Sequence, residues 1–104
     1  MTFTIHRHDL VWTDLDTITF YIADYAGFEV AEAKTYEIEN AILRLKDFPH
    51  IGTVRNEVLS GLRVVTSIEK AVICFTVDDE ARVVRILSVT YAGQDWQRIT
   101  KARE

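Results

Sequence analysis

The sequence predicts an α+β fold of the order β-α-α-β-β-β, in which an antiparallel sheet packs on an antiparallel helical hairpin. Two long segments of helical periodicity precede residue 48, and three runs rich in β-forming residues follow from residue 62. The segment 48–63 between them holds the only proline, Pro49, and two of the four glycines, Gly52 and Gly61. These residues favour turns at both ends, so the segment forms a joint between the two halves and is a candidate place for a site.

The amino-terminal half is predicted to contain a short strand and a first helix. Residues 2–6 alternate and are rich in β-forming side chains. From Asp9 the apolar residues recur at steps of four, three, four and three, which indicates one face of an amphipathic helix over residues 9–26: Val11, Leu15, Ile18, Ile22 and Tyr25. We expect Asp9 to cap its start and Gly27 to supply the left-handed residue after its end.

A second helix is predicted over residues 28–46. The same rhythm recurs, and one further alanine widens the stripe: Ala31, Thr35, Ile38, Ala41, Ile42 and Leu45. Glu29 in the first turn and Arg44 in the last complement the helix dipole. Because Gly27 alone separates the two helices, they must fold back on each other as an antiparallel hairpin.

The second half is predicted to form three strands, residues 62–67, 71–77 and 82–90. Polar turns around Glu69 and Lys70 and around residues 78–80 separate them, and such short connections make neighbouring strands antiparallel. In the middle run one face carries Ile73, Phe75 and Val77 and the other carries Val72, Cys74 and Thr76. Both faces are mostly apolar, so we expect this strand to be central and covered on both sides.

The last predicted strand sets what each face of the sheet does. Strict alternation places Val84 and Ile86 on one face and places Arg85, Leu87 and Val89 on the other. We expect the first face to take the helical hairpin and the second to be a groove with arginines at its edge, open to a protein partner. The polar tail, residues 100–104, is expected either to fray or to extend a short last helix that begins at Gln94.

Composition sets the outer bounds. A chain of 104 residues forms one domain, residues 1–104, and its 48% hydrophobic and 27% charged residues are typical of a soluble globular protein. No apolar run has membrane-spanning length and the start, MTFTIHRHD, lacks the apolar core of a signal peptide, so a cytoplasmic location is expected. A net charge of -4 argues against a broad nucleic-acid surface and leaves room only for a small basic patch.

Residues that could carry chemistry are few. The single cysteine, Cys74, lies inside an apolar strand, which favours a buried thiol over a nucleophile. His6 and His8 alone would make a weak metal site, and His50 in the joint is more typical of a plain loop histidine than of a proton donor. The sequence has no phosphate-binding glycine loop, metal-ligand spacing or serine elbow, so we expect no cofactor and no metal.

The spacing within the joint resembles that of a known family. Six residues carry the pattern: Pro49, Gly52, Glu57, Gly61, Leu62 and Arg63. Two apolar strands and the segment VTYAGQDW follow them. Together these features resemble the RelE/ParE family of bacterial toxins from type II toxin-antitoxin pairs, over residues 9–96. The resemblance implies the same α+β fold and a cognate antitoxin that wraps over the sheet and hairpin. It also implies that the toxin forms a homodimer, or a heterotetramer with the antitoxin. Antitoxins in this family are often acidic partners of basic toxins.

The chain departs from the family pattern near its carboxyl end. Tyr91 stands where many relatives have histidine, and residues 92–94 are Ala, Gly and Gln where relatives have arginines, before Asp95 and Trp96 resume the pattern. RelE-like members are mRNA nucleases that act on the ribosome and rely on basic side chains, in some with a tyrosine. If this chain is such a nuclease, the resemblance points to Arg63, Arg85 and Tyr91, although an aromatic that ends a core strand is the simpler interpretation of Tyr91.

Two functions of different classes therefore remain. The first is a ParE-like toxin that acts by binding and is not an enzyme, which the acidic balance, the long hairpin and the missing arginines favour; the resemblance implies DNA gyrase as its target and inhibition of gyrase as its effect. The second is a ribosome-dependent mRNA endonuclease, and a third possibility is a degenerate, non-toxic binding partner. The binding candidates are Arg55, Arg63, Arg82, Arg85, Tyr91, Gln94 and Trp96. Arg63 either binds a phosphate or carboxylate, or locks the joint by pairing with an acid such as Glu57.

Overall fold

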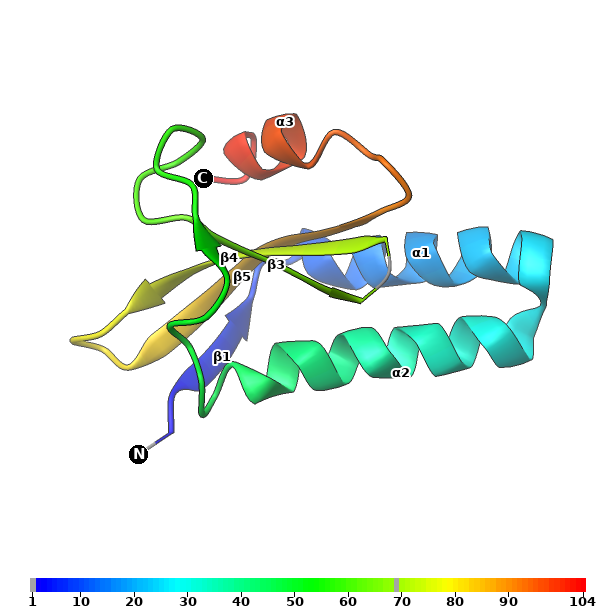
Figure 1. Ribbon diagram of the computed structural model, residues 1–104, viewed down its shortest axis with the longest axis horizontal. Helices are drawn as coiled ribbons and strands as arrows, with labels where there is room; N and C mark the ends of the chain where they lie inside the picture. Colours follow the sequence, from blue (N-terminus) through cyan, green and yellow to red (C-terminus); the bar gives the residue numbers. More distant parts are fainter. Residues whose placement is uncertain (1, 69) are drawn as a thin grey trace.

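The computed structural model describes residues 2–68 and 70–104, without the side chains of residues 67 and 68. Its elements in chain order are β1 (Thr4–Arg7), α1 (Leu10–Ala26), α2 (Phe28–Arg44), β2 (Thr53–Val54), β3 (Arg63–Ile68), β4 (Ala71–Asp78), β5 (Val83–Tyr91) and α3 (Trp96–Lys101). The predicted α+β order is confirmed, with the two-residue strand β2 added (Figure 1). Of the turn expected at Glu69 and Lys70, Glu69 lies outside the described residues.

The five strands form one sheet in the order β1-β5-β4-β3-β2. The predicted antiparallel pairing of β3, β4 and β5 is confirmed, and β4 is central as expected. The first strand, whose partner the sequence did not predict, joins the sheet at one edge, where β1 pairs with β5 in parallel. A parallel pair needs a long connection, and the hairpin together with β2 to β4 lies between these two strands in the sequence.

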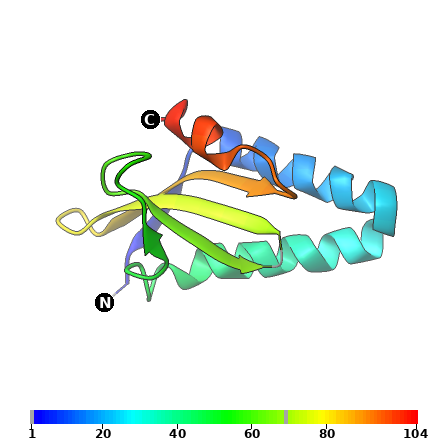
Figure 2. The same ribbon diagram turned by 45° about the horizontal axis from the view of Figure 1, so that its top comes forward.

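The helical hairpin packs on one face of the sheet (Figure 2). The predicted stripes of α1 and α2 are buried against β3, β4 and β5, except at Thr35, which is half-buried, and at Tyr25, which is exposed. Between the helices, the hydroxyl groups of Thr19 and Thr35 lie 2.8 Å apart. The buried side chains of this core are Phe3, Val11, Leu15, Ile18, Ile22, Ala31, Ile38, Ala41, Ile42, Leu45, Val65, Ala71, Ile73, Phe75, Val84, Ile86, Val89 and Tyr91.

The helix ends follow the prediction in one of two places. Gly27 has φ +90 and donates its backbone N–H to the carbonyl of Ala23 at 2.9 Å, which ends α1 as expected. Asp9 makes no side-chain cap; instead Nδ1 of His8 accepts the backbone N–H of Leu10 at 3.1 Å. Asp9 already has helical backbone angles, so its side chain is not placed to reach the first free N–H groups.

A β-bulge in β5 changes which residues face the hairpin. Cys74 lies opposite Ser88 and Phe75 lies opposite Ile86, so Leu87 has no partner in β4. An extra residue shifts the alternation by one, and every later side chain then points to the other face. Val89 is therefore in the core beneath the hairpin, and the prediction that it shares a face with Arg85 is wrong.

The opposite face of the sheet is partly covered by the chain itself, so the expectation of an open groove there is wrong in part. The hydroxyl groups of Thr100 in α3 and Ser88 in β5 lie 2.7 Å apart, and both residues are buried. Trp96 packs on the same face against a second apolar cluster that contains Leu62, Val64 and Cys74. Only one residue of the six-residue helix α3 is buried, which is too little to give a periodic signal in the sequence.

The buried thiol of Cys74 can be used to test whether α3 covers this face of the sheet. The loss of solvent raises the pKa of the Cys74 thiol, and contacts with Thr100 and Ser88 only partly offset this rise. Because the thiolate is the reactive form, we expect Ellman's reagent to label the folded protein much more slowly than the urea-unfolded protein at pH 8. A thiol pKa that is higher in the folded state also means that this residue favours folding below about pH 8.5, an advantage that is lost as the pH rises further.

The control for this measurement is glutathione treated with the same reagent, which fixes the rate of a free thiol. Labelling of the folded protein at that rate would contradict a sealed layer over Cys74.

Candidate functional site

Arg63 secures the joint through the backbone of the preceding loop. Its guanidinium donates to the carbonyl oxygen of Ile51 at 3.4 Å, while the acid expected for it, Glu57, pairs with Nε of Arg55 at 2.5 Å. The hydrogen bond from Arg55 lowers the pKa of the Glu57 carboxyl. Arg63 thus contacts the loop at the strand entry through a carbonyl, and Glu57, the acid named for it in the pairing alternative, has Arg55 as its partner.

Two pairs of candidate residues are brought together by the fold. The guanidinium carbon of Arg55 lies 5.0 Å from the centre of the Trp96 ring, which joins the loop before β3 to the start of α3. Oε1 of Gln94 accepts the backbone N–H of Tyr91 at 2.9 Å and closes the turn after β5. Both contacts hold loops in place, so these side chains stabilise the structure whether or not they bind a ligand.

Arg82 and Arg85 lie toward the other end of β5. Arg82, in the turn before the strand, has its guanidinium 4.6 Å from the centre of the Phe3 ring. Arg85 is half exposed and lies 3.7 Å from a carboxylate oxygen of Asp78. Along β5 a residue advances the chain by about 3.3 Å, so Arg82 and Tyr91 lie at opposite ends of the strand and cannot contact one small ligand.

The three residues named for a nuclease do not converge. Residues directly opposite each other in a sheet point to the same face. Arg63 is opposite Phe75, on the hairpin face, whereas Arg85 is opposite Thr76, on the α3 face. Tyr91 is only 6% exposed, at the far end of β5, and its hydroxyl lies 3.4 Å from that of Tyr25. Groups that assist cleavage must all reach the same phosphate, and this arrangement places them apart.

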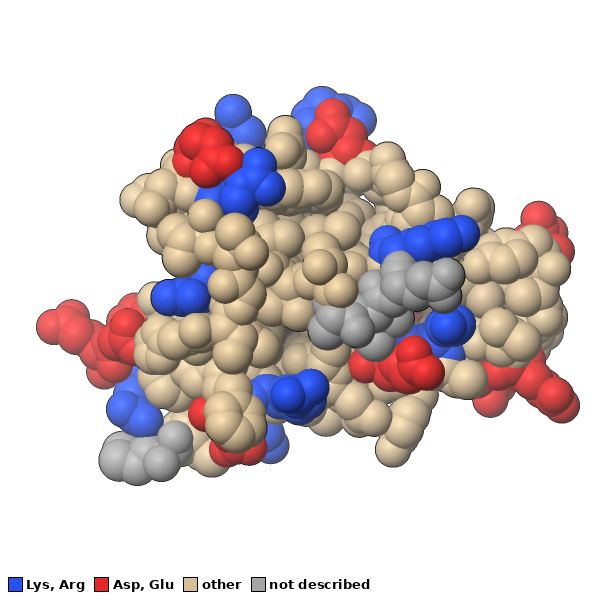
Figure 3. Space-filling view, in the orientation of Figure 1, with Lys and Arg blue, Asp and Glu red and all other residues tan. Residues whose placement is uncertain are grey.

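The surface that sequence reasoning missed lies on the helical hairpin. Six large aromatic side chains of α1 and α2 are exposed: Trp12, Phe20, Tyr21, Tyr25, Phe28 and Tyr36. The signal was present in the sequence, because five of them fall outside the apolar stripe that was assigned to the core. Helix α1 contains three aspartates and no lysine or arginine, and acidic side chains gather at the end of the molecule where the hairpin turns (Figure 3).

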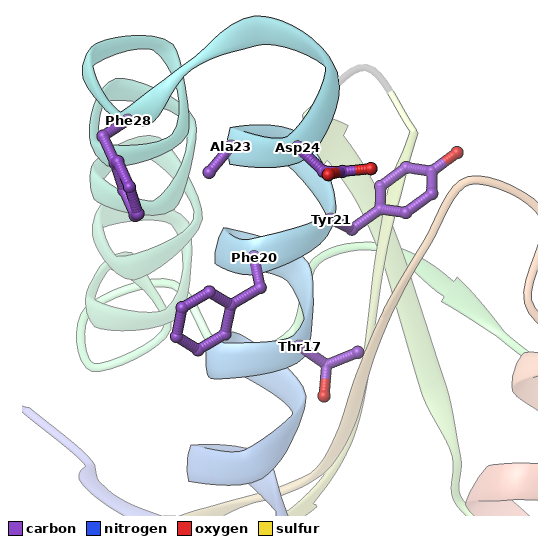
Figure 4. A pocket seen from close by; sticks show the side chains of 6 residues that line it. All are labelled: Thr17, Phe20, Tyr21, Ala23, Asp24 and Phe28. Carbon is purple, nitrogen blue, oxygen red and sulfur yellow. The ribbon is translucent and has the colours of Figure 1, made fainter.

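A shallow hollow of about 680 Å³ opens at this end of the hairpin (Figure 4). Its lining consists of Thr17, Phe20, Tyr21, Ala23, Asp24 and Phe28. A second, smaller hollow of about 180 Å³ shares Thr17 and Tyr21 with it and extends to the turn at Tyr91, Ala92 and Gln94. The Tyr21 ring lies edge-on to Tyr25 at 5.4 Å and to Tyr91 at 5.9 Å, which fixes the wall between the two hollows.

Comparison with known proteins supplies the family. A family model described as the ParE toxin of the type II toxin-antitoxin system parDE matches residues 5–96. The chain belongs to this family. It is a toxin of a type II toxin-antitoxin system, of the ParE/RelE type that its sequence resembles. No curated protein sequence matches it.

Solved structures agree with the fold of this ParE-family toxin. The chromosomal ParDE system of P. aeruginosa has a chain 21% identical to it with a TM-score of 0.73, over 86% of this chain and 96% of that one. A chain of the RelBE2 toxin-antitoxin complex of Mycobacterium tuberculosis is 19% identical, with a TM-score of 0.65, over 88% of this chain and 100% of that one. E. coli toxin RelE in the free state, with two arginines replaced by alanine, is 12% identical, with a TM-score of 0.66, over 98% of this chain and 96% of that one. At these identities the likeness shows the fold alone.

The residues that carry the family pattern build the joint of this ParE-family toxin. Gly52 has φ +83 where the chain enters β2, and Gly61 has φ +77 just before β3. Oδ1 of Asn56 accepts the backbone N–H of Gly61 at 2.8 Å and closes the loop between them.

Across the described residues, no helix is long and apolar enough to cross a membrane.

Proposed function

We propose that this toxin acts by binding: it inhibits DNA gyrase in the cytoplasm, as a ParE-like toxin, and a cognate antitoxin neutralises it. The observation that carries the proposal is the separation of Arg63, Arg85 and Tyr91 onto two faces and two ends of the sheet. A nuclease of the RelE kind needs such groups around one phosphate, whereas a binding toxin needs none of them there.

The exposed aromatic side chains of the hairpin support the same conclusion. Protein interfaces are enriched in tyrosine, tryptophan and phenylalanine, and large exposed apolar patches mark such interfaces. Phe20 and Phe28 are 65% and 63% exposed, and neither is needed to complete the core. An acidic surface without lysine or arginine on α1 also repels nucleic acid, which favours a protein target over a message.

A cognate antitoxin is part of the proposal. The P. aeruginosa and M. tuberculosis structures are described as toxin-antitoxin systems or complexes, and their toxin chains share this fold. A partner that covers the hairpin would bury aromatic side chains that this chain exposes by itself. The toxin is expected either to form a homodimer by itself or to form a heterotetramer with the antitoxin.

The deciding experiment measures supercoiling by purified gyrase beside translation-coupled mRNA cleavage, each with and without the toxin. We expect inhibited supercoiling with intact message, and restored supercoiling when the product of the neighbouring small gene is added. The variant Tyr91→Phe sharpens the cleavage assay, because loss of one hydroxyl would impair a nuclease that uses Tyr91. Codon-position cuts with unaffected gyrase would overturn the proposal in favour of a RelE-like nuclease.

A further inference from the structure

The tip of the helical hairpin combines a hollow lined by aromatic side chains with exposed acidic side chains. We define the tip surface as the residues that line the larger hollow together with Glu29 and Glu32. In Figure 4, Phe20 from α1 and Phe28 from the start of α2 lie on one side of α1, while Tyr21 and Asp24 lie on the other. The hollow is therefore bounded by aromatic rings from both helices, which suit contact with an apolar side chain of a partner.

The charged residues of the tip surface, Asp24, Glu29 and Glu32, are all acidic, and the rest of the hairpin has the same bias. Residues 10–43 contain seven acids and a single base, Lys34. Two of those acids are already neutralised by arginines, Asp14 by Arg103 and Glu39 by Arg7. The other five are exposed: Asp16, Asp24, Glu29, Glu32 and Glu37. A partner on this surface gains from positive charge and loses from negative charge.

We propose that the tip surface binds a basic amphipathic segment of the antitoxin, with an apolar side chain in the hollow between Phe20 and Phe28 and lysine or arginine side chains against Asp24 and Glu29. This inference rests on the proposed function, which supplies the antitoxin. The acidic partner that family resemblance suggests would meet acidic groups here, so the sign of the pairing is reversed in this toxin. A second copy of the chain fits poorly for the same reason, since two acidic tips would face each other.

The test uses overlapping peptides that span the product of the gene next to the toxin, with binding followed by fluorescence anisotropy. We expect the binding peptide to carry net positive charge, and Phe20→Ala and Phe28→Ala each to weaken it by about tenfold or more. Asp24→Lys should weaken it and reduce its dependence on salt. The matched controls are Phe48→Ala, an exposed aromatic in the joint, and Glu80→Lys, an exposed acid in the turn between β4 and β5.

Three results would overturn the inference. The first is a binding peptide that is neutral or acidic. The second is a loss of affinity in Phe48→Ala or Glu80→Lys as large as in the tip variants, or no loss in the tip variants. The third is a toxin dimer that Phe20→Ala dissociates, which would assign the tip to a second copy. The peptide assay needs no gyrase, so a failed supercoiling assay would reject the proposed target and leave this result intact.

Discussion

Replacing Arg103 by methionine should lower the free energy of unfolding by about 3 to 5 kcal/mol, because it removes one partner of a largely buried ion pair. Nη1 and Nη2 of Arg103 lie 2.5 and 2.8 Å from the two carboxylate oxygens of Asp14, and the side chains are only 12% and 11% exposed. Urea unfolding followed by tryptophan fluorescence measures the change as a lower midpoint.

The pair also completes the bulge in β5. Arg103 donates to the carbonyl of Leu87 at 3.2 Å, and Asp14 accepts the backbone N–H of Val89 at 3.0 Å. These are the backbone groups on either side of the irregular step, where the ladder to β4 is interrupted. Arg103→Met therefore leaves a buried carboxylate without its cation and a strand carbonyl without its donor, and each loss adds to the cost.

The matched control is Arg98→Met, which breaks an ion pair on the surface of α3. Arg98 lies 3.5 Å from Asp95, and these side chains are 80% and 58% exposed. Such a pair contributes about 0 to 1 kcal/mol, so the control should unfold close to the unmodified protein. Equal midpoints for Arg103→Met and Arg98→Met would show that the tail is not anchored through Asp14.

The ion pair of Arg103 with Asp14 belongs to the part of the fold that the sequence does not predict. The helices and the three late strands follow from local periodicity, since the burial of Ile18 or Phe75 recurs at fixed steps from its neighbours. The pairing of Asp14 with Arg103 joins residues 89 positions apart and has no local pattern. From the sequence, the tail was expected either to fray or to extend a short last helix, and neither alternative included its contacts with α1 and β5 through Arg103.

The candidate site was predicted unevenly for the same reason. Arg63 was recognised as a strand entry from its place in a motif, but its contact with the carbonyl of Ile51 depends on how the loop folds back. The bulge at Leu87 moved Val89 across the sheet, because one unpaired residue cannot be told from regular alternation in the sequence. Phe20 and Phe28, by contrast, could have been found, because each lies off the stripe that the period assigns to the core.

Gly52→Ala should destabilise the toxin by about 2 to 5 kcal/mol, the sum of left-handed strain and overpacking. Gly52 has φ +83, and a Cβ atom there would lie 2.5 Å from the carbonyl oxygen of Val64 and 2.8 Å from Cγ2 of Val65. The first of these atoms belongs to the backbone of β3, which is held between β2 and β4 and cannot yield cheaply. The urea midpoint and the thermal transition both measure the loss.

Gly61→Ala separates the two causes of that loss. Gly61 has a similar backbone angle, φ +77, but a Cβ atom there would meet nothing within 4 Å. Its replacement should cost only the strain of the left-handed conformation, about 1 to 2 kcal/mol, so the difference between the variants isolates the contact with β3. If both variants unfold at the same urea concentration, the close approach of the joint to β3 contributes nothing. A larger loss at Gly52 would explain why the family spacing places a glycine three residues after Pro49: the loop passes so near the strand that only a hydrogen atom fits.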